Sequence, residues 1–323
     1  MLKAMKKVYI RVVLVALAVF MGLDRGYAQQ DPQLSQYMWN PFILNPAVAG
    51  TLGSYQVRIN SRFQWTGIDD APQTYQLCAY GPDVKRRMGW GGQLYSDLLG
   101  PVSTTGFMLS YAYNIQIAEN FSLSGGISAG GLQYKVDGTK LDAGDLVNHP
   151  ELGDSWLNDP ALRNSSMSSF APDATVGLYL YNSNMHFGIA AHHLFGSKLK
   201  FNDQSIGLNK LKQHVYVSGG YIFNINRELA LEPTLLLKFM NGAPIVPELN
   251  CKAKYLIDIR RVQSELWGGV SFRYGDAAAM MFGIVYEKRY LFGYAFDWSY
   301  TKLGRYTNGT HEIMVGILFE KIK

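Results

Sequence analysis

The sequence predicts an all-β protein, a transmembrane antiparallel β-barrel of about 14 strands with both termini on the periplasmic side. Three observations predict this fold. From Ser54 onward, apolar and polar residues alternate in segments of roughly ten residues, a length that crosses a bilayer at a tilt. Only 17% of the 323 residues are charged while 13% are aromatic, which suits strands with one face toward lipid. Beyond residue 28, no apolar run reaches the about 20 residues that a transmembrane helix needs.

The predicted strands follow one another with turn residues between them. Alternation is clearest over residues 291–300, where aromatic side chains at every second position oppose small or polar ones. A soluble β-sandwich is the alternative, but Tyr and Trp at the ends of the apolar faces favour a membrane-interface girdle. The predicted strands lie near residues 54–64, 73–81, 89–97, 103–115, 120–136, 172–182, 185–195, 213–224, 229–240, 247–258, 262–274, 277–288, 290–302 and 310–320.

The lengths of the connections predict how the barrel is oriented. In outer-membrane barrels the periplasmic turns are short and the outer loops are long. The two longest connections, residues 137–171 and 196–212, follow the fifth and the seventh predicted strands, whereas the connections after even-numbered strands are short. A miscount by one strand would break this pattern. We therefore expect the short turns, and both termini, to face the periplasm.

Residues 1–28 are predicted to be a signal peptide. Basic residues between Lys3 and Arg11 precede the apolar stretch 12–23, and the leader ends on Gly26-Tyr27-Ala28, with small residues where a signal peptidase cleaves. A membrane anchor is the alternative. It is disfavoured because the apolar stretch is shorter than the about 20 residues of a spanning helix.

The mature chain is predicted to have two parts. Residues 29–53 show no strand alternation and contain several turn formers, so we interpret them as a periplasmic lead-in, with folding into the barrel mouth as a second option. Residues 54–323 form the predicted outer-membrane barrel. The leader carries most of the formal net charge of +5, so the mature chain is nearly neutral and its charge gives no argument for nucleic-acid binding.

No catalytic or metal-binding constellation is recognisable. His192 and His193, with His186 nearby, form the only histidine cluster, and adjacent residues on a strand point to opposite faces, so they cannot bind one ion together. Cys78 and Cys251 are predicted on opposite faces of their strands and therefore as free thiols. A barrel-borne lipase or acyltransferase would need a Ser and a His at lipid-facing rim positions, and we cannot assemble such a pair. We expect no enzyme activity, no cofactor and no metal.

The predicted inward face carries mainly Gly, Ser and Ala, with scattered charges at Glu265, Arg273, Glu287 and Asp297. A porin more often rings its channel with charge. A barrel of this size lies between eight-stranded barrels that side chains fill and 16-stranded open porins. Small inward residues allow either another segment to pack inside or a narrow passage, and the sequence leaves both options open.

The predicted periplasmic turns are basic. Arg86 and Arg87 fall on one such turn, and Arg260 and Arg261 fall on another. One interpretation is that they are ordinary solvated turn residues. The other is a docking face for a periplasmic partner, which makes these four arginines candidate partner-binding residues.

One segment carries a resemblance to a known family. The chain from Gln29 to Thr51 reads QQDPQLSQYMWNPFILNPAVAGT. It resembles the start of mature members of the PorP/SprF family of Bacteroidetes, which begin D-P-x-x-S-Q-Y, an aromatic residue, N-P, then L-N-P-A-x-A-G. A following R-I-N-x-R-x-Q-W strand, His193-Leu194-Phe195 and His311-Glu312-Ile313 are also family-like. Many barrel proteins end on an aromatic residue that serves as an assembly signal. This chain differs, because four more residues follow Phe319.

The resemblance implies a non-enzymatic outer-membrane barrel of the type IX secretion and gliding-motility machinery. Such proteins help to secrete or anchor large surface adhesins and are coupled to periplasmic, peptidoglycan-associated components. The implied partners are therefore these components, a surface adhesin and outer-membrane lipid, with no nucleic acid and no cofactor. An outer-membrane channel for small solutes is the alternative. The motif residues that we single out as candidate partner-binding residues are Tyr37, Trp39, Asn40, Pro41, Asn45 and Pro46.

Overall fold

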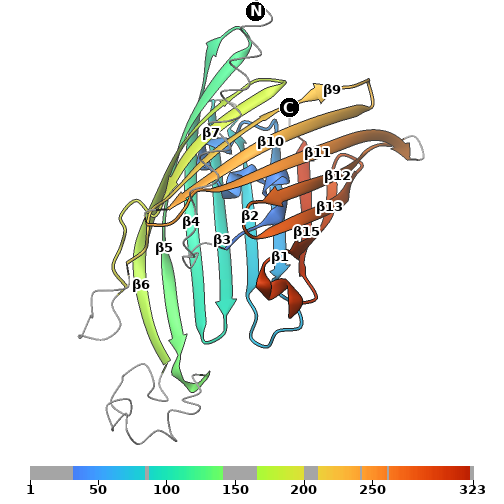
Figure 1. The fold of residues 1–323 in the computed structure, drawn as a ribbon. Coiled ribbons are helices and arrows are strands. Elements are labelled where there is room, and N and C mark those ends of the chain that lie inside the picture. Colours follow the sequence, from blue (N-terminus) through green and yellow to red (C-terminus); the bar gives the residue numbers. More distant parts are fainter. Residues whose placement is uncertain are drawn as a thin grey trace, which may run out of the picture.

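The computed structural model describes residues 32–83, 87–140, 166–199, 210–240, 242–259 and 262–320. These residues form one antiparallel sheet that curves into a barrel (Figure 1). Its strands are β1 (Ser54–Phe63), β2 (Gln73–Asp83), β3 (Met88–Leu99), β4 (Val102–Ala118), β5 (Phe121–Asp137), β6 (Ser166–Tyr181), β7 (Met185–His192), β8 (His214–Tyr221), β9 (Phe223–Asn224), β10 (Leu229–Met240), β11 (Val246–Ile259), β12 (Val262–Arg273), β13 (Ala277–Tyr286), β14 (Tyr290–Ser299) and β15 (Thr310–Glu320). The predicted signal peptide lies outside the described residues.

The sheet closes on itself. β1 pairs with β15, and β10 pairs with β11, so both ends of the strand order are joined. Only Ile222 separates β8 from β9, and both pair with β10. They are two parts of one strand, so the predicted 14-strand antiparallel barrel is confirmed.

The main differences from the prediction concern strand ends. β6 begins at Ser166, six residues before the predicted start, because it pairs with β5 as far as Asp137. β7 ends at His192 and not at residue 195, because His193 has a φ of 55° and leaves the extended conformation. Pairing with the long strand β5 thus extends β6, and the left-handed backbone conformation of His193 ends β7 early.

The two ends of the barrel differ. β1 begins, and β15 ends, at what we call the turn end, where the connections between β2 and β3, β4 and β5, and β6 and β7 are short. We call the opposite end the loop end. Both long connections, 138–165 and 193–213, join strands whose described ends lie at this end, as the connection lengths predict. Among the described residues, no helix is long and apolar enough to cross a membrane.

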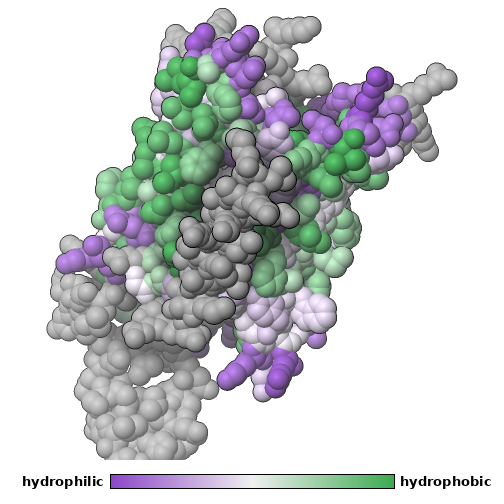
Figure 2. Space-filling view, turned by 45° about the horizontal axis from the view of Figure 1, so that its top comes forward, coloured by the Kyte–Doolittle hydropathy of each residue, from purple (hydrophilic) through white to green (hydrophobic). Residues whose placement is uncertain are grey.

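The outer wall of the barrel is apolar. Figure 2 shows hydrophobic side chains over much of the wall, with hydrophilic ones toward its ends. Alternation places every second residue of a strand on this face, where Leu109, Ile127 and Met280 are exposed. In a membrane, this face contacts lipid. Cys251 shares the outer face while Cys78 is buried inside, so both cysteines are free, as predicted.

The residues before β1 do not form a strand. Three short 3-10 helices follow one another in this segment: η1 (Ser35–Trp39), η2 (Pro41–Ile43) and η3 (Pro46–Val48). Most of their side chains are buried, and with inward residues of the wall they form the main hydrophobic cluster of the described chain. We call residues 32–51 the plug.

Candidate functional site: the plug and the barrel lumen

The plug crosses the lumen from the loop-end half to the turn end. Ser35, at its start, contacts Asp297 and Glu312, which lie in the loop-end halves of β14 and β15. Ala49, near its end, lies against Gly89 at the turn end of β3. The sequence left two positions open for this segment, a periplasmic lead-in or the barrel mouth. The structure places the plug within the barrel.

The two Asn-Pro pairs of the motif explain the local shape of the plug. Pro41 begins η2 and Pro46 begins η3, positions at which proline's fixed φ favours helix and its missing N–H is not needed. Asn45 caps η3, because its Oδ1 accepts a hydrogen bond from the Ala47 N–H at 2.9 Å. The plug is therefore a series of short helical turns with breaks at Asn40 and Asn45, and not one continuous helix.

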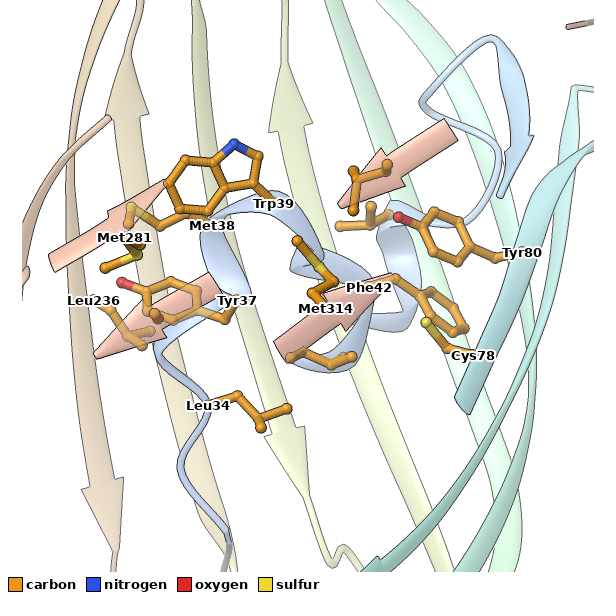
Figure 3. Close-up of a cluster of buried hydrophobic side chains, with 14 of the residues drawn as sticks. Leu34, Tyr37, Met38, Trp39, Phe42, Cys78, Tyr80, Leu236, Met281 and Met314 are labelled. Atoms are coloured by element: carbon orange, nitrogen blue, oxygen red, sulfur yellow. The ribbon is translucent and has the colours of Figure 1, made fainter. Parts of the chain in front are cut away.

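Aromatic stacking attaches the plug to two separate parts of the wall, and Figure 3 labels the plug rings Trp39 and Phe42 with the wall ring Tyr80. Trp39 stacks on Trp267 of β12 with ring centroids 3.9 Å apart. Phe42 stacks on Tyr80 of β2 at 4.5 Å. All four rings are buried, and stacked pairs add about 0.5–1.5 kcal/mol to the gain from burial.

Inward glycines make room for the plug. A Cβ at Gly126 would lie 2.4 Å from the Ala47 nitrogen, and one at Gly177 would lie 2.0 Å from the Asn45 Oδ1. No side chain fits at such distances, so the glycine-rich inward face is shaped to the plug backbone. The inward glycines whose added Cβ would meet the plug are Gly89, Gly91, Gly126, Gly177, Gly188, Gly269 and Gly293.

A buried ionic network holds the start of the plug. Glu312 accepts hydrogen bonds from the backbone N–H groups of Ser35 at 2.7 Å and Gln36 at 3.1 Å. Arg62 bridges Glu312 at 3.0 Å and Asp297 at 2.8 Å. The Ser35 hydroxyl donates to Asp297 at 2.6 Å. The network joins β1, β14 and β15 to the plug, and each charge has an opposite partner.

The ionic network continues along the neighbouring strands, because Arg273 of β12 lies 3.6 Å from Asp297. Glu248 of β11 pairs with Lys238 and with Arg273, each at 3.1 Å. Lys252 pairs with Glu232 at 2.8 Å. The expectation of a mild lumen with scattered charges is therefore wrong: acids and bases from adjacent strands are concentrated there and neutralise one another.

Of the four charged residues that we expected to face inward, three line the lumen and one does not. Arg273 and Asp297 belong to the networks, and Glu265 lies 3.9 Å from Lys254. Glu287 does not line the lumen wall, because it follows β13 in the turn and has a φ of 53°. Alternation alone would have placed Arg62 on the same inward face as Arg58, so part of the network was readable in the sequence.

The asparagines of the motif bind the wall directly. The Asn45 side-chain amide donates to the Leu178 carbonyl at 2.9 Å and to the Ile189 carbonyl at 3.3 Å, so it bridges β6 and β7. Asn40 donates to the Cys78 sulfur at 3.0 Å. The Asn250 side chain of β11 donates to the Tyr37 hydroxyl. The motif residues that we singled out thus lie together in the plug, and several of them hold it in place.

The basic turns are only partly described. Arg87 is exposed at the turn end, with a φ of 57°, and its carbonyl accepts a hydrogen bond from the Asn114 N–H at 2.9 Å. Arg86, Arg260 and Arg261 lie outside the described residues. The structure thus places one of the four candidate arginines on the solvent-exposed rim.

The histidine pair differs from the expectation. His192 contacts the Leu44 carbonyl at 2.8 Å, and His193 contacts Asp173 at 2.8 Å. The prediction that they point to opposite faces is wrong, because the left-handed φ of His193 breaks the alternation and turns its ring to the buried side. Within the described ranges, no three His, Cys, Asp or Glu residues lie close enough to hold a metal ion.

A large cavity opens between the plug and the turn end, and we call it the vestibule. Its volume is about 980 Å³. Trp39, Pro41 and Val48 of the plug line it, together with wall residues such as Arg58 and Lys252. The plug therefore separates the vestibule from the loop-end half of the lumen.

A closed barrel with an apolar outer belt and an internal plug defines a membrane β-barrel of the outer-membrane type. The family model described as type IX secretion system membrane protein PorP/SprF matches residues 26–317. The chain belongs to this family, and it is located in the outer membrane. The family assignment and the channel-like fold point to a non-enzymatic protein.

Solved structures of outer-membrane barrels are similar to this chain. The CymD monoaromatic hydrocarbon channel is 11% identical, with a TM-score of 0.51, and the match covers 91% of this chain and 94% of that one. A Pseudomonas aeruginosa FadL homologue is 12% identical, with a TM-score of 0.49 and coverage of 85% and 92%. The likeness to the CymD channel, at this identity, shows an outer-membrane barrel fold and nothing about cargo. No curated protein sequence matches the chain.

Proposed function

We propose that this protein helps to secrete or anchor surface adhesins as a non-enzymatic scaffold of the type IX secretion and gliding machinery, and that it links to periplasmic components. The plug is the observation that carries this proposal. It is held across the lumen by stacked aromatic rings, by a buried ionic network and by hydrogen bonds to β6, β7, β11 and β15. A barrel filled in this way suits a rigid docking platform better than a passive pore.

The turn end is the face that we assign to the periplasm. Short turns are typical of that side, and the vestibule opens there. We propose that the basic turns with Arg86, Arg87, Arg260 and Arg261 dock a periplasmic, peptidoglycan-associated partner. The motif residues that line the vestibule, among them Trp39 and Asn45, then form the inner part of the same interface.

Gene deletion tests the secretion role. Deleting the gene should abolish the display or secretion of at least one surface protein, measured by proteomics of the cell surface and the medium. Re-expression of the wild-type chain should restore it. An unchanged surface proteome in the deletion strain would refute the proposal.

Charge reversal tests the docking face. Replacing Arg86, Arg87, Arg260 and Arg261 with glutamate should prevent co-purification of the periplasmic partner from native membranes. The matched control reverses Lys302 and Arg305 in η7 (Lys302–Arg305) at the loop end. Equal recovery of the partner with both variants would argue against docking at the turns.

The motif offers a separate test. Replacing Trp39 and both Asn-Pro pairs should leave membrane insertion intact and abolish secretion if the motif serves partner binding. The bonds from Asn45 to β6 and β7 give the motif a structural role as well. Loss of the inserted barrel itself would therefore assign the motif to folding.

A channel for small solutes is the second candidate function. The vestibule, about 980 Å³ in volume, favours it because it could admit a solute from the turn end. Single-channel recording on the purified protein separates the two candidates. Steady conductance of the wild-type barrel would favour the channel, and silence would favour the plugged scaffold.

A further inference from the structure

Arg58 differs from the other buried basic residues of the described chain. Arg62, Lys238, Lys252 and Arg273 each have a carboxylate within 4 Å. Arg58 is only 5% exposed, yet it forms no ion pair with any described residue, and its Nε and Nη1 have no hydrogen-bond partner. An arginine stays charged in any protein environment, so this charge is buried without compensation.

The surroundings of Arg58 hold it in place without neutralising it. Its Nη2 donates to the Gln56 side-chain oxygen, which also accepts a hydrogen bond from the Tyr80 hydroxyl at 2.9 Å. Gly316 faces it on β15, where an added Cβ would lie 3.1 Å from the Arg58 Cγ. The neutral side chain of Gln56 on one side and Gly316 on the other thus hold the guanidinium in one position.

Arg58 lies on the wall of the vestibule, which gives this charge access to a ligand. The other charges there largely cancel, because Lys252 pairs with Glu232 and Lys254 lies 3.9 Å from Glu265. The net field of the cavity near Arg58 is therefore positive. An anion that enters from the turn end therefore meets a positive charge that no described acid neutralises.

The size and lining of the vestibule indicate what carries the anion. A cavity of about 980 Å³ is much larger than a single carboxylate or phosphate requires. Its wall carries both side-chain amides or hydroxyls and apolar groups, a combination that suits peptide groups and side chains. The amide and hydroxyl residues of the lining include Gln56, Gln116, Ser122, Tyr181, Ser218 and Gln263, and the apolar ones include Leu256, Val285, Leu291 and Leu318.

We propose that the vestibule binds a carboxylate-bearing peptide segment of a partner protein and that Arg58 pairs with its acid group. This site deepens the proposed function and rests on its assignment of the vestibule to a partner, but its test does not depend on what the barrel helps to secrete. The carboxylate supplies the opposite charge that Arg58 lacks among the described residues. The plug forms the floor of the site, so the peptide enters the lumen without passing through it.

Fluorescence polarisation on the full-length barrel in detergent tests this site. The probe is a pool of fluorescent hexapeptides with a free C-terminal carboxylate, compared with the same pool as C-terminal amides. The carboxylate pool should bind at least about ten-fold more tightly, the change expected for one hydrogen-bonded charge pair. Equal binding of the two pools, or no binding of either, would overturn the proposal whatever the variants do.

Matched variants locate the site. Arg58→Gln should remove the preference for carboxylate without lowering the thermal stability of the barrel. Arg87→Gln, which removes the same charge from the exposed rim of the same end, should keep the preference. A preference that persists in Arg58→Gln, or is lost in Arg87→Gln, would place the anion site elsewhere.

The chain's own C-terminal carboxylate is the other source of the same chemistry. A Gly/Ser extension after Lys323 moves that carboxylate away from the barrel. The extended chain should bind the carboxylate pool as the wild type does. Binding that appears only with the extended chain would show that the chain's own terminus occupies the site and would overturn assignment to a partner.

Discussion

Gly126→Val should displace the plug while the barrel wall stays intact. A Cβ at this position would lie 2.4 Å from the Ala47 nitrogen and 2.6 Å from its Cα, both of them backbone atoms. No rotamer change of the plug can relieve such a contact, so η3 must move by about 1 Å or more. Gly125 precedes it on β5 and faces outward, where an added Cβ meets only Leu178 at 3.7 Å.

The magnitude follows from what holds η3. Overpacking of this kind costs about 1–3 kcal/mol. The three hydrogen bonds of Asn45, to Ala47, Leu178 and Ile189, contribute about 0.5–1.5 kcal/mol each. The two terms are comparable, so the variant should populate a state in which η3 is detached from β6 and β7.

Single-channel recording in planar bilayers is the assay. Gly126→Val should conduct in measurable steps, whereas Gly125→Val and the wild type should stay silent. Heat-modifiable migration on gels checks that each barrel is folded. Equal conductance of the two variants would refute the reasoning, and so would failure of Gly126→Val alone to assemble, because the plug would then be a folding element that cannot be displaced.

Three further predictions concern the attachment of the plug. Glu312→Ala removes one of the two carboxylates of Arg62 and the acceptor of two plug N–H groups, so it should destabilise the protein by about 2–6 kcal/mol in denaturant unfolding, with Glu312→Gln losing less; equal stability of Glu312→Ala and the wild type would contradict the network. Asn45→Ala should cost about 2 kcal/mol and speed hydrogen exchange at the Ala47 amide, while unchanged exchange there would rule out the cap. In a Cys251→Ser background, Cys78 should resist a membrane-impermeant maleimide in the wild type and react in Gly126→Val, and rapid labelling of both would mean that the plug does not cover it.

Much of the barrel was predictable from the sequence because a strand's side-chain period is two. Alternation over residues such as 291–300 identifies the wall, and connection length identifies the two ends. The strand ends were less predictable. β6 is longer than its own pattern suggests because β5 supplies a partner as far as Asp137, and pairing of this kind depends on the neighbour.

The candidate site was predictable only in part. The motif around Tyr37 and Asn45 stands out in the sequence, and alternation places Arg58 and Arg62 on one face. Neither pattern says which residues meet. Arg62 reaches Glu312, 250 positions away, only because β1 pairs with β15 when the sheet closes.

By itself, the sequence determined the barrel, its strand number and the presence of an unusual segment before the first strand. The tertiary structure decided that this segment fills the lumen, that the inward glycines are shaped to its backbone, and that the inward charges pair. The physical reason is that alternation fixes the direction of a side chain, whereas closure of the barrel fixes its neighbours. Arg58, buried in the vestibule wall without an acid, can be recognised only once those neighbours are known.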